Sequence, residues 1–95
     1  MPYDGRMKNE TAGQAVKALV DNAAVGARVM DVRKRLGLSR YAVCKAIDIN
    51  NVALRRLENG KGFCGIPTLV SLANVYKCST DWILGLSTDG APKGL

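Results

Sequence analysis

The sequence predicts an all-α protein, because apolar residues recur at helical spacing in segment after segment. In the stretch from residue 38 to residue 60, Val43, Ala46 and Ile47 fall at i, i+3 and i+4. Leu54 and Leu57 repeat the i, i+3 step shortly afterwards. With 95 residues, the chain is long enough for one modest core. We therefore expect a single helical domain built around two short neighbouring helices.

Capping residues mark where these two helices begin. Ser39 stands at the N-cap position of the first helix, and Asn50 does the same for the second. Only Asp48 and Ile49 separate the end of the first helix from the cap of the second. A link this short predicts a sharp corner between the helices.

The outer face of the second helix carries amide and guanidinium side chains. Amide and guanidinium groups at i, i+4 converge on one surface, and such groups hydrogen-bond base edges and phosphates. The pattern therefore predicts a helix-turn-helix in which the second helix is the reader. The residues left on its outer face are Asn51, Val52, Arg55, Arg56 and Asn59.

The net charge of +6 is concentrated around this unit. Between Arg28 and Lys61 there are nine basic and three acidic residues, whereas the rest of the chain is balanced at five of each. A solvated basic face is the alternative interpretation. The coincidence with the helix-turn-helix pattern favours a polyanionic partner such as double-stranded DNA.

Composition argues against several other classes of protein. The three cysteines, Cys44, Cys64 and Cys78, form no C-x-x-C pair, and the chain has no histidine. We expect no metal site, no disulfide framework, no cofactor and a reducing cytoplasmic location. No apolar run approaches membrane-spanning length, so no membrane partner is expected. No acid–base or nucleophile constellation is present, so we do not expect an enzyme.

Two helices are predicted before the central pair. Residues 10–22 have Ala15, Ala18 and Leu19 along one side and predict a short N-terminal helix. The segment from Val25 to Leu36 predicts a clearer amphipathic helix, which Gly37 ends with a left-handed cap. Its inward stripe is Val25, Val29, Val32 and Leu36, and its outward residues are Arg28, Arg33, Lys34 and Arg35.

Two more helices are predicted after the central pair. Residues 66–76 form the first, with Pro67 tolerated in its first turn and a core stripe of Ile66, Leu69, Leu72, Ala73 and Tyr76. Ser79 caps the second, Thr80 to Leu84, which Gly85 closes. We expect an arm at 1–24, a helix-turn-helix domain at 25–86 and a disordered tail at 87–95.

Residues 25–86 resemble the Cro/CI-like (XRE-type, lambda-repressor-like) helix-turn-helix domains of phage repressors and bacterial regulators. The resemblance rests on RKRLGLSR at 33–40, LENGK at 57–61 and STDWILG at 79–85, with spacing that fits the family. It implies a five-helix domain, here with an extra N-terminal helix. It also implies that the third helix of the domain enters the major groove.

The resemblance also implies roles for individual residues. Asn51, Val52, Arg55 and Arg56 match positions that often touch bases, and the apolar Val52 suits a thymine methyl group. Glu58 matches a residue that pairs with an arginine at the position of Arg33, so an Arg33–Glu58 ion pair is predicted. The expected phosphate contacts are Arg40, Tyr41, Asn59, Gly60 and Lys61; for Tyr41, surface packing is the alternative.

Some positions depart from the family pattern. Asp48 and Lys77 stand where glycine is usual, and Cys44 replaces an alanine. Cys64 and Gly65 replace residues that help to cap the following helix. Trp82 is expected in the core or in a dimer contact. Phe63 has three open interpretations: a phosphate-side contact, a protrusion or a lid on the core.

These patterns predict a sequence-specific transcriptional regulator. We expect a repressor, or a small switch protein of a phage or mobile element, that binds a two-fold symmetric operator as a homodimer. The dimer contacts would come from the region Trp82 to Leu86, from the N-terminal helix, or from both. The alternative is an antitoxin or another protein-interaction module of the same fold that neutralises a partner protein.

Overall fold

The computed structural model describes residues 20–94, most of which form helices. The described part of the chain contains no β-strand, so the predicted all-α class is confirmed. The predicted helix over residues 10–22 lies almost wholly outside the described residues. The helices are α2 (Asn22–Arg35), α3 (Arg40–Ile47), α4 (Asn51–Glu58), α5 (Ile66–Tyr76) and α6 (Thr80–Leu84).

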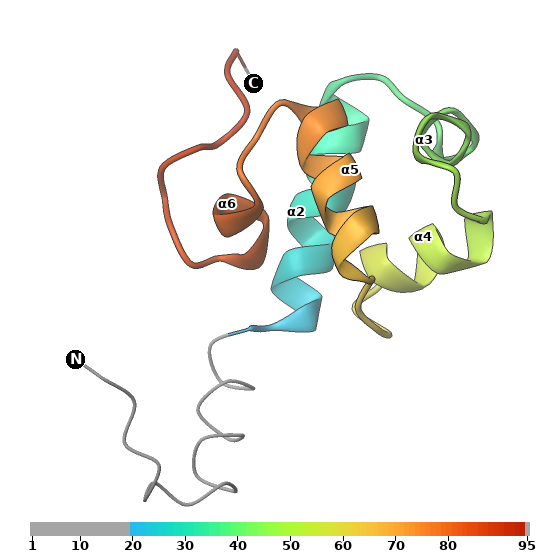
Figure 1. Cartoon of the computed structure of the whole chain (residues 1–95), viewed down its shortest axis with the longest axis horizontal. Coiled ribbons are helices and arrows are strands. Elements are labelled where there is room, and N and C mark those ends of the chain that lie inside the picture. The colour runs from blue at the N-terminus through green and yellow to red at the C-terminus, as the bar shows by residue number, and fades with distance from the viewer. Residues whose placement is uncertain (1–19, 95) are drawn as a thin grey trace, which may run out of the picture.

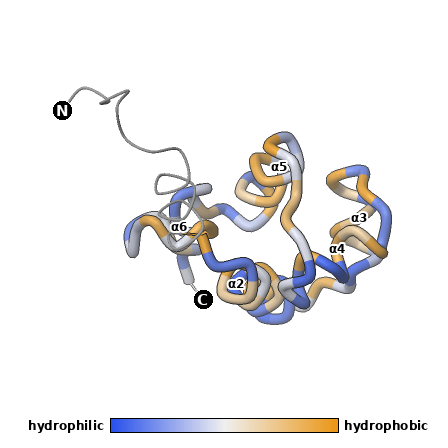
Figure 2. Tube along the Cα trace, turned by 90° about the horizontal axis from the view of Figure 1, so that it is seen from below, coloured by the Kyte–Doolittle hydropathy of each residue, from blue (hydrophilic) through white to orange (hydrophobic). Residues whose placement is uncertain are grey.

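The helices pack around a central pair. Figure 1 shows α2 and α5 in the middle of the domain, with α3 and α4 on one side and α6 with the C-terminal segment on the other. In agreement with this view, α2 contacts α4 and α6, while α5 contacts α3 and α6. Hydrophilic and hydrophobic stretches alternate along the helices (Figure 2), as expected where one face of each helix packs on the domain.

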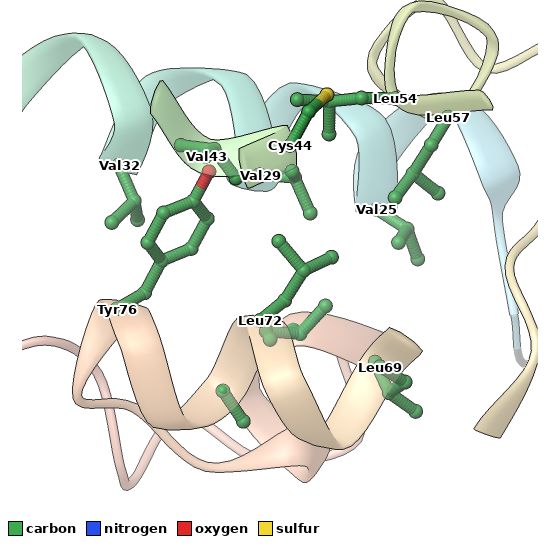
Figure 3. Close-up of a cluster of buried hydrophobic side chains, with 12 residues drawn as sticks. Val25, Val29, Val32, Val43, Cys44, Leu54, Leu57, Leu69, Leu72 and Tyr76 are labelled. Atoms are coloured by element: carbon green, nitrogen blue, oxygen red, sulfur yellow. The ribbon is translucent and has the colours of Figure 1, made fainter. Parts of the chain in front are cut away.

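The core lies between α2, α3, α4 and α5, and Ile83 of α6 completes it. Leu72 of α5 points toward α2, and the Tyr76 ring lies beside Val32 with its hydroxyl close to Val43 of α3 (Figure 3). Burying several such side chains contributes about 1.5–3 kcal/mol each, which is the main stabilisation available to so small a domain. Residues of the predicted stripes that are buried are Val25, Val29, Val32, Val43, Leu54, Leu57, Leu69, Leu72, Ala73 and Tyr76.

Four stripe or face assignments were wrong. Ala46 is exposed, because the buried face of α3 runs through Val43, Cys44 and Ile47, about 100° away around the helix. Leu36 and Ile66 stand at helix ends with few neighbours and are 41% and 76% exposed. Arg33 was expected to face outward, yet it is buried at 7% exposure. Its charge is tolerated there because it has an anionic partner, described below.

The start of α2 and the end of the chain also differ from expectation. We predicted that this helix begins at Val25, but it begins at Asn22, three residues earlier, where Asp21 caps it by accepting a hydrogen bond from Ala23 N at 3.0 Å. The tail was expected to be disordered, and the structure describes it as far as residue 94. Residues 87–94 form turns that pass around α6 (Figure 1), and the Ser79 N–H donates to Gly90 O at 2.9 Å.

Candidate nucleic-acid interface

The helix-turn-helix forms as the capping residues predict. Ser39 Oγ accepts a hydrogen bond from Ala42 N at 3.0 Å, and Asn50 Oδ1 accepts one from Ala53 N at 2.7 Å. Between the two helices, Asp48 adopts the left-handed conformation with φ 58°. Aspartate tolerates this region better than most residues, so the turn keeps its shape without glycine.

The outer face of α4 is open to solvent. Leu54 and Leu57 are buried against the domain, whereas Asn51, Val52 and Arg55 are exposed on the other side. Arg56 and Asn59 are also exposed, so all five residues predicted for this face lie at the surface. Val52, a branched apolar side chain, is 64% exposed.

Arg56 is turned toward the segment that follows α4. Its Nη2 donates to the carbonyl oxygen of Lys61 at 3.2 Å, and the Lys61 N–H donates back to Arg56 O at 2.9 Å. Arg56 therefore supports the turn that carries the predicted phosphate contacts Asn59, Gly60 and Lys61. Its predicted base contact would have to come from the rest of its guanidinium group.

Gly60 has a structural role that goes beyond ending α4. Its φ is 70°, and a Cβ at this position would lie 2.8 Å from the Cα of Ala23 in α2. Only glycine satisfies both conditions. This turn is therefore held close to the start of α2.

A buried ion pair joins α2 to α4. Arg33 Nε lies 2.6 Å from Glu58 Oε2, and Arg33 Nη2 lies 3.0 Å from Glu58 Oε1, in a two-point contact. The hydrogen bond that Arg33 donates to Glu58 raises the pKa of Arg33 above its already high ordinary value. The predicted Arg33–Glu58 pair is present in the structure.

Arg40 does not simply face outward, as a phosphate contact would. Its Nε donates to Glu58 Oε1 at 3.1 Å, and its side chain is 35% exposed. Tyr41, the next residue along α3, is 72% exposed and free to meet a ligand. Sequence reasoning missed the contact between Arg40 and Glu58, because nothing in local spacing links positions so far apart.

A hollow of about 410 Å³ lies alongside α4 and the link to α5. Val52 and Arg56 line it from the helix, and Phe63, Cys64 and Thr68 line it from the link and from α5. Phe63 is 47% exposed at this hollow, so it is not a lid that seals the core. Sequence reasoning did not anticipate this hollow.

The three cysteines are free thiols. Cys44 is buried and the other two are half-buried, and burial raises the pKa of all three. Within residues 20–94, no group of His, Cys, Asp and Glu side chains is arranged to hold a metal ion. Among the described helices, none is both long and apolar enough to cross a bilayer.

Two residues that position the site were missed. Gly26 lies in the middle of α2, where a Cβ would lie 2.7 Å from the carbonyl oxygen of Glu58. Arg28 Nε donates to Ile83 O at 2.9 Å and so holds α6 against α2. A glycine inside a strongly helical segment was the available signal for the first, since glycine disfavours helices unless close packing requires it.

Comparison with known proteins agrees with this geometry. The chain matches the family described as Helix-turn-helix over residues 29–83, which is more than half of its length. It is 31% identical over 71 residues to the HTH-type transcriptional regulator DicA of Escherichia coli (strain K12). That match covers 75% of this chain and 53% of DicA, so the chain spans about half the length of this relative.

Solved structures show the same fold. The P22 c2 repressor protein, in complex with synthetic operator 9T, matches with a TM-score of 0.63 at 27% identity. The restriction-modification controller protein C.AhdI from Aeromonas hydrophila matches with a TM-score of 0.62, and its 17% identity supports the fold alone. Each match covers 66% of this chain and 96% of the other. The chain therefore belongs to the Cro/CI-like (XRE-type) helix-turn-helix family of transcriptional regulators.

Proposed function

We propose that the protein is a sequence-specific DNA-binding repressor that inserts α4 into the major groove. The observation that carries this proposal is the outer face of α4, where polar and basic side chains are exposed while Leu54 and Leu57 anchor the helix. A helix with one fixed face and one open face of this chemistry fits the major groove. The family membership and the operator complex of the P22 c2 repressor support the same conclusion.

Base reading and phosphate binding are divided between two sets of residues in this proposal. Bases would be read from α4, with Arg55 suited to guanine, Asn51 to adenine and Val52 to a thymine methyl group. Phosphates would be bound on either side, by the start of α3 and by the turn after α4. The base set is Asn51, Val52, Arg55 and Arg56, and the phosphate set is Arg40, Tyr41, Asn59, Gly60 and Lys61.

The operator would be two-fold symmetric and the protein would bind it as a dimer. A single eight-residue helix contacts too few bases for useful specificity, so two copies would read half-sites about one helical turn, or 34 Å, apart. The surface of α6 around Trp82 is half-buried against the core, and Leu86 is 52% exposed beside it. This region supports the proposed dimer contact.

Selection of bound sequences from a random duplex pool at near-physiological salt tests the proposal. Recovery of a palindromic motif would support sequence-specific binding and dimeric recognition together. Recovery of no motif, with only salt-sensitive bulk binding, would contradict it. That second outcome would favour the alternative of an antitoxin, to be checked by purifying the protein with the product of a neighbouring gene.

A further inference from the structure

We propose that Arg40 is a positioning residue that fixes the angle of α4 against α3. The proposal rests on where this contact falls in the motif. Arg40 is the first residue of α3, and Glu58 is the last residue of α4. The turn at residues 48–50 joins the opposite ends of the same two helices. The 3.1 Å contact between Arg40 Nε and Glu58 Oε1 therefore spans the open side of the angle between them.

A contact at this place has the greatest possible leverage on the angle. Each helix has eight residues, so its far end lies about 12 Å from the turn. Tilting α4 by about 10° about the turn would move its far end by about 2 Å, which is enough to break hydrogen bonds to base edges. Arg55 and Arg56 lie in the second half of α4 and would be displaced more than Asn51 and Val52.

Glu58 is well suited to hold two arginines at once. Its side chain is fully buried, and its carboxylate accepts three N–H groups, two from Arg33 and one from Arg40. Arg33 also donates through Nη1 to Leu38 O at 3.0 Å, just before the cap of α3. One buried carboxylate thus connects α2, the link into α3, the start of α3 and the end of α4.

The cluster of Arg33, Arg40 and Glu58 carries an uneven number of charges. Two guanidinium groups and one carboxylate leave a net charge of +1. Arg33 is buried, whereas Arg40 is 35% exposed, so the uncompensated charge emerges at Arg40. Lysine cannot replace arginine here without loss, because the contact uses the Nε–H of Arg40 and a lysine side chain carries a methylene group, not a donor, at that position.

The first measurement is amide hydrogen exchange on the full-length protein without DNA. Arg40→Lys keeps the charge but loses the Nε–H donor, and we expect it to raise exchange about three- to tenfold at residues 54–58 of α4 while α5 stays unchanged. Arg40→Gln should show the same local effect. Arg35→Lys is the matched control, because Arg35 pairs with Asp31 at 3.0 Å on the exposed surface of α2. This control should leave the exchange rates of both α4 and α5 unchanged.

Exchange that rises equally in α4 and α5 would show general destabilisation and would overturn the proposal. Exchange that stays unchanged in α4 would also overturn it. This measurement uses no DNA, so it decides the role of Arg40 in holding α4 even if the protein proves not to bind a specific operator.

The second measurement concerns the recognition of operator bases, and it rests on the DNA-binding function proposed above. With the selected operator, Arg40→Lys should lower the ratio of specific to non-specific affinity about tenfold while the salt dependence of binding stays unchanged. Arg40→Gln should lower the same ratio and also flatten the salt dependence. If Arg40→Lys leaves the ratio unchanged while Arg40→Gln weakens all sequences alike, Arg40 is a phosphate contact only and the positioning role is wrong.

Discussion

Gly26 of α2 lies directly against the backbone of Leu57 in α4, with no room for a side chain between them. A Cβ on Gly26 would overlap the carbonyl oxygen of Leu57 and would lie 2.7 Å from that of Glu58. Backbone atoms at the end of α4 cannot move aside as a flexible side chain can. The absence of one side chain thus sets how closely the proposed reading helix approaches the core.

Gly26→Ala should therefore destabilise the protein even though alanine favours helices. We expect the free energy of unfolding to fall by about 1–3 kcal/mol, because the added methyl group forces α2 and α4 apart. Chemical denaturation measures this change. Gly62→Ala is the control, since its Cβ would lie 3.6 Å from the nearest atom, an ordinary contact. A stable Gly26→Ala protein would mean that the two helices separate at little cost.

Arg28→Ala should loosen α6. The guanidinium donates to the carbonyl oxygen of Ile83, a residue that is 1% exposed, so removing the donor leaves a buried acceptor without its partner. We expect a loss of about 1–2 kcal/mol in the free energy of unfolding. Arg35→Ala breaks an exposed pair and should change the same quantity by less than about 0.5 kcal/mol. Equal losses in the two variants would contradict a specific role for Arg28.

Lys77→Gly should stabilise the protein. Lys77 ends α5 with φ 55°, a left-handed conformation that costs a residue with a side chain about 1 kcal/mol. Glycine adopts it without that cost, and urea denaturation should show a gain of similar size. Asn74→Gly, at an exposed position inside α5, should instead lower the stability because glycine is a poor helix former. A loss in both variants would show that Lys77 is not strained.

Tyr76→Phe should preserve or raise stability. Tyr76 is 1% exposed, and its hydroxyl has no hydrogen-bond partner among the described residues. Removing an unsatisfied buried hydroxyl should raise the free energy of unfolding by up to about 1 kcal/mol. A loss larger than about 1 kcal/mol would show that the hydroxyl is satisfied in solution.

The same variant predicts a pH effect. Burial raises the pKa of Tyr76 above its ordinary value, so the folded state keeps the proton when the unfolded chain releases it. The stability of the wild type relative to Tyr76→Phe should thus be constant below about pH 9 and should fall as the pH rises through about 10. Parallel denaturation series of the two proteins measure this difference, in which the other titrating groups cancel. A difference that stays flat up to pH 11 would contradict the raised pKa.

Arg55→Ala tests base reading directly. If the Arg55 side chain bonds a base edge, its loss should cost about 1–3 kcal/mol of specific binding and relax one operator position. Lys61→Ala should instead weaken binding to all sequences alike and flatten the salt dependence. Affinities for the selected operator and for random duplex separate the two effects. Equal losses on both DNAs for Arg55→Ala would refute the base-reading role.

Local signals in the sequence predicted local structure well. The bounds of α5 and α6 and the caps Ser39, Asn50 and Ser79 agree with the structure, because capping and helical spacing depend on neighbouring residues. Family resemblance added the Arg33–Glu58 pair, which no local pattern could provide. The assignments of individual DNA contacts stay predictions.

Tertiary contacts explain what sequence reasoning missed. Helical spacing assigns every charged residue to the outside. It could not show that Arg33 is buried, because the carboxylate that pairs with it lies 25 positions away in the sequence. The second arginine on Glu58 was missed for the same reason. Ile66 was assigned to the core by spacing alone, yet it is exposed. The first residue of a helix is buried only where another element packs against that end of the helix.

The position of Ser79 has a consequence for how the domain opens. Its hydroxyl accepts from Trp82 N at 3.0 Å and lies 3.5 Å from Asp89 O, and its own N–H bonds Gly90 O. A five-residue helix is too short to persist alone, so α6 depends on this junction and on Arg28. The C-terminal turns and α6 should accordingly open together, as one cooperative unit of lower stability than the rest. In that state α6 and the C-terminal turns would be detached while the helix-turn-helix stays folded.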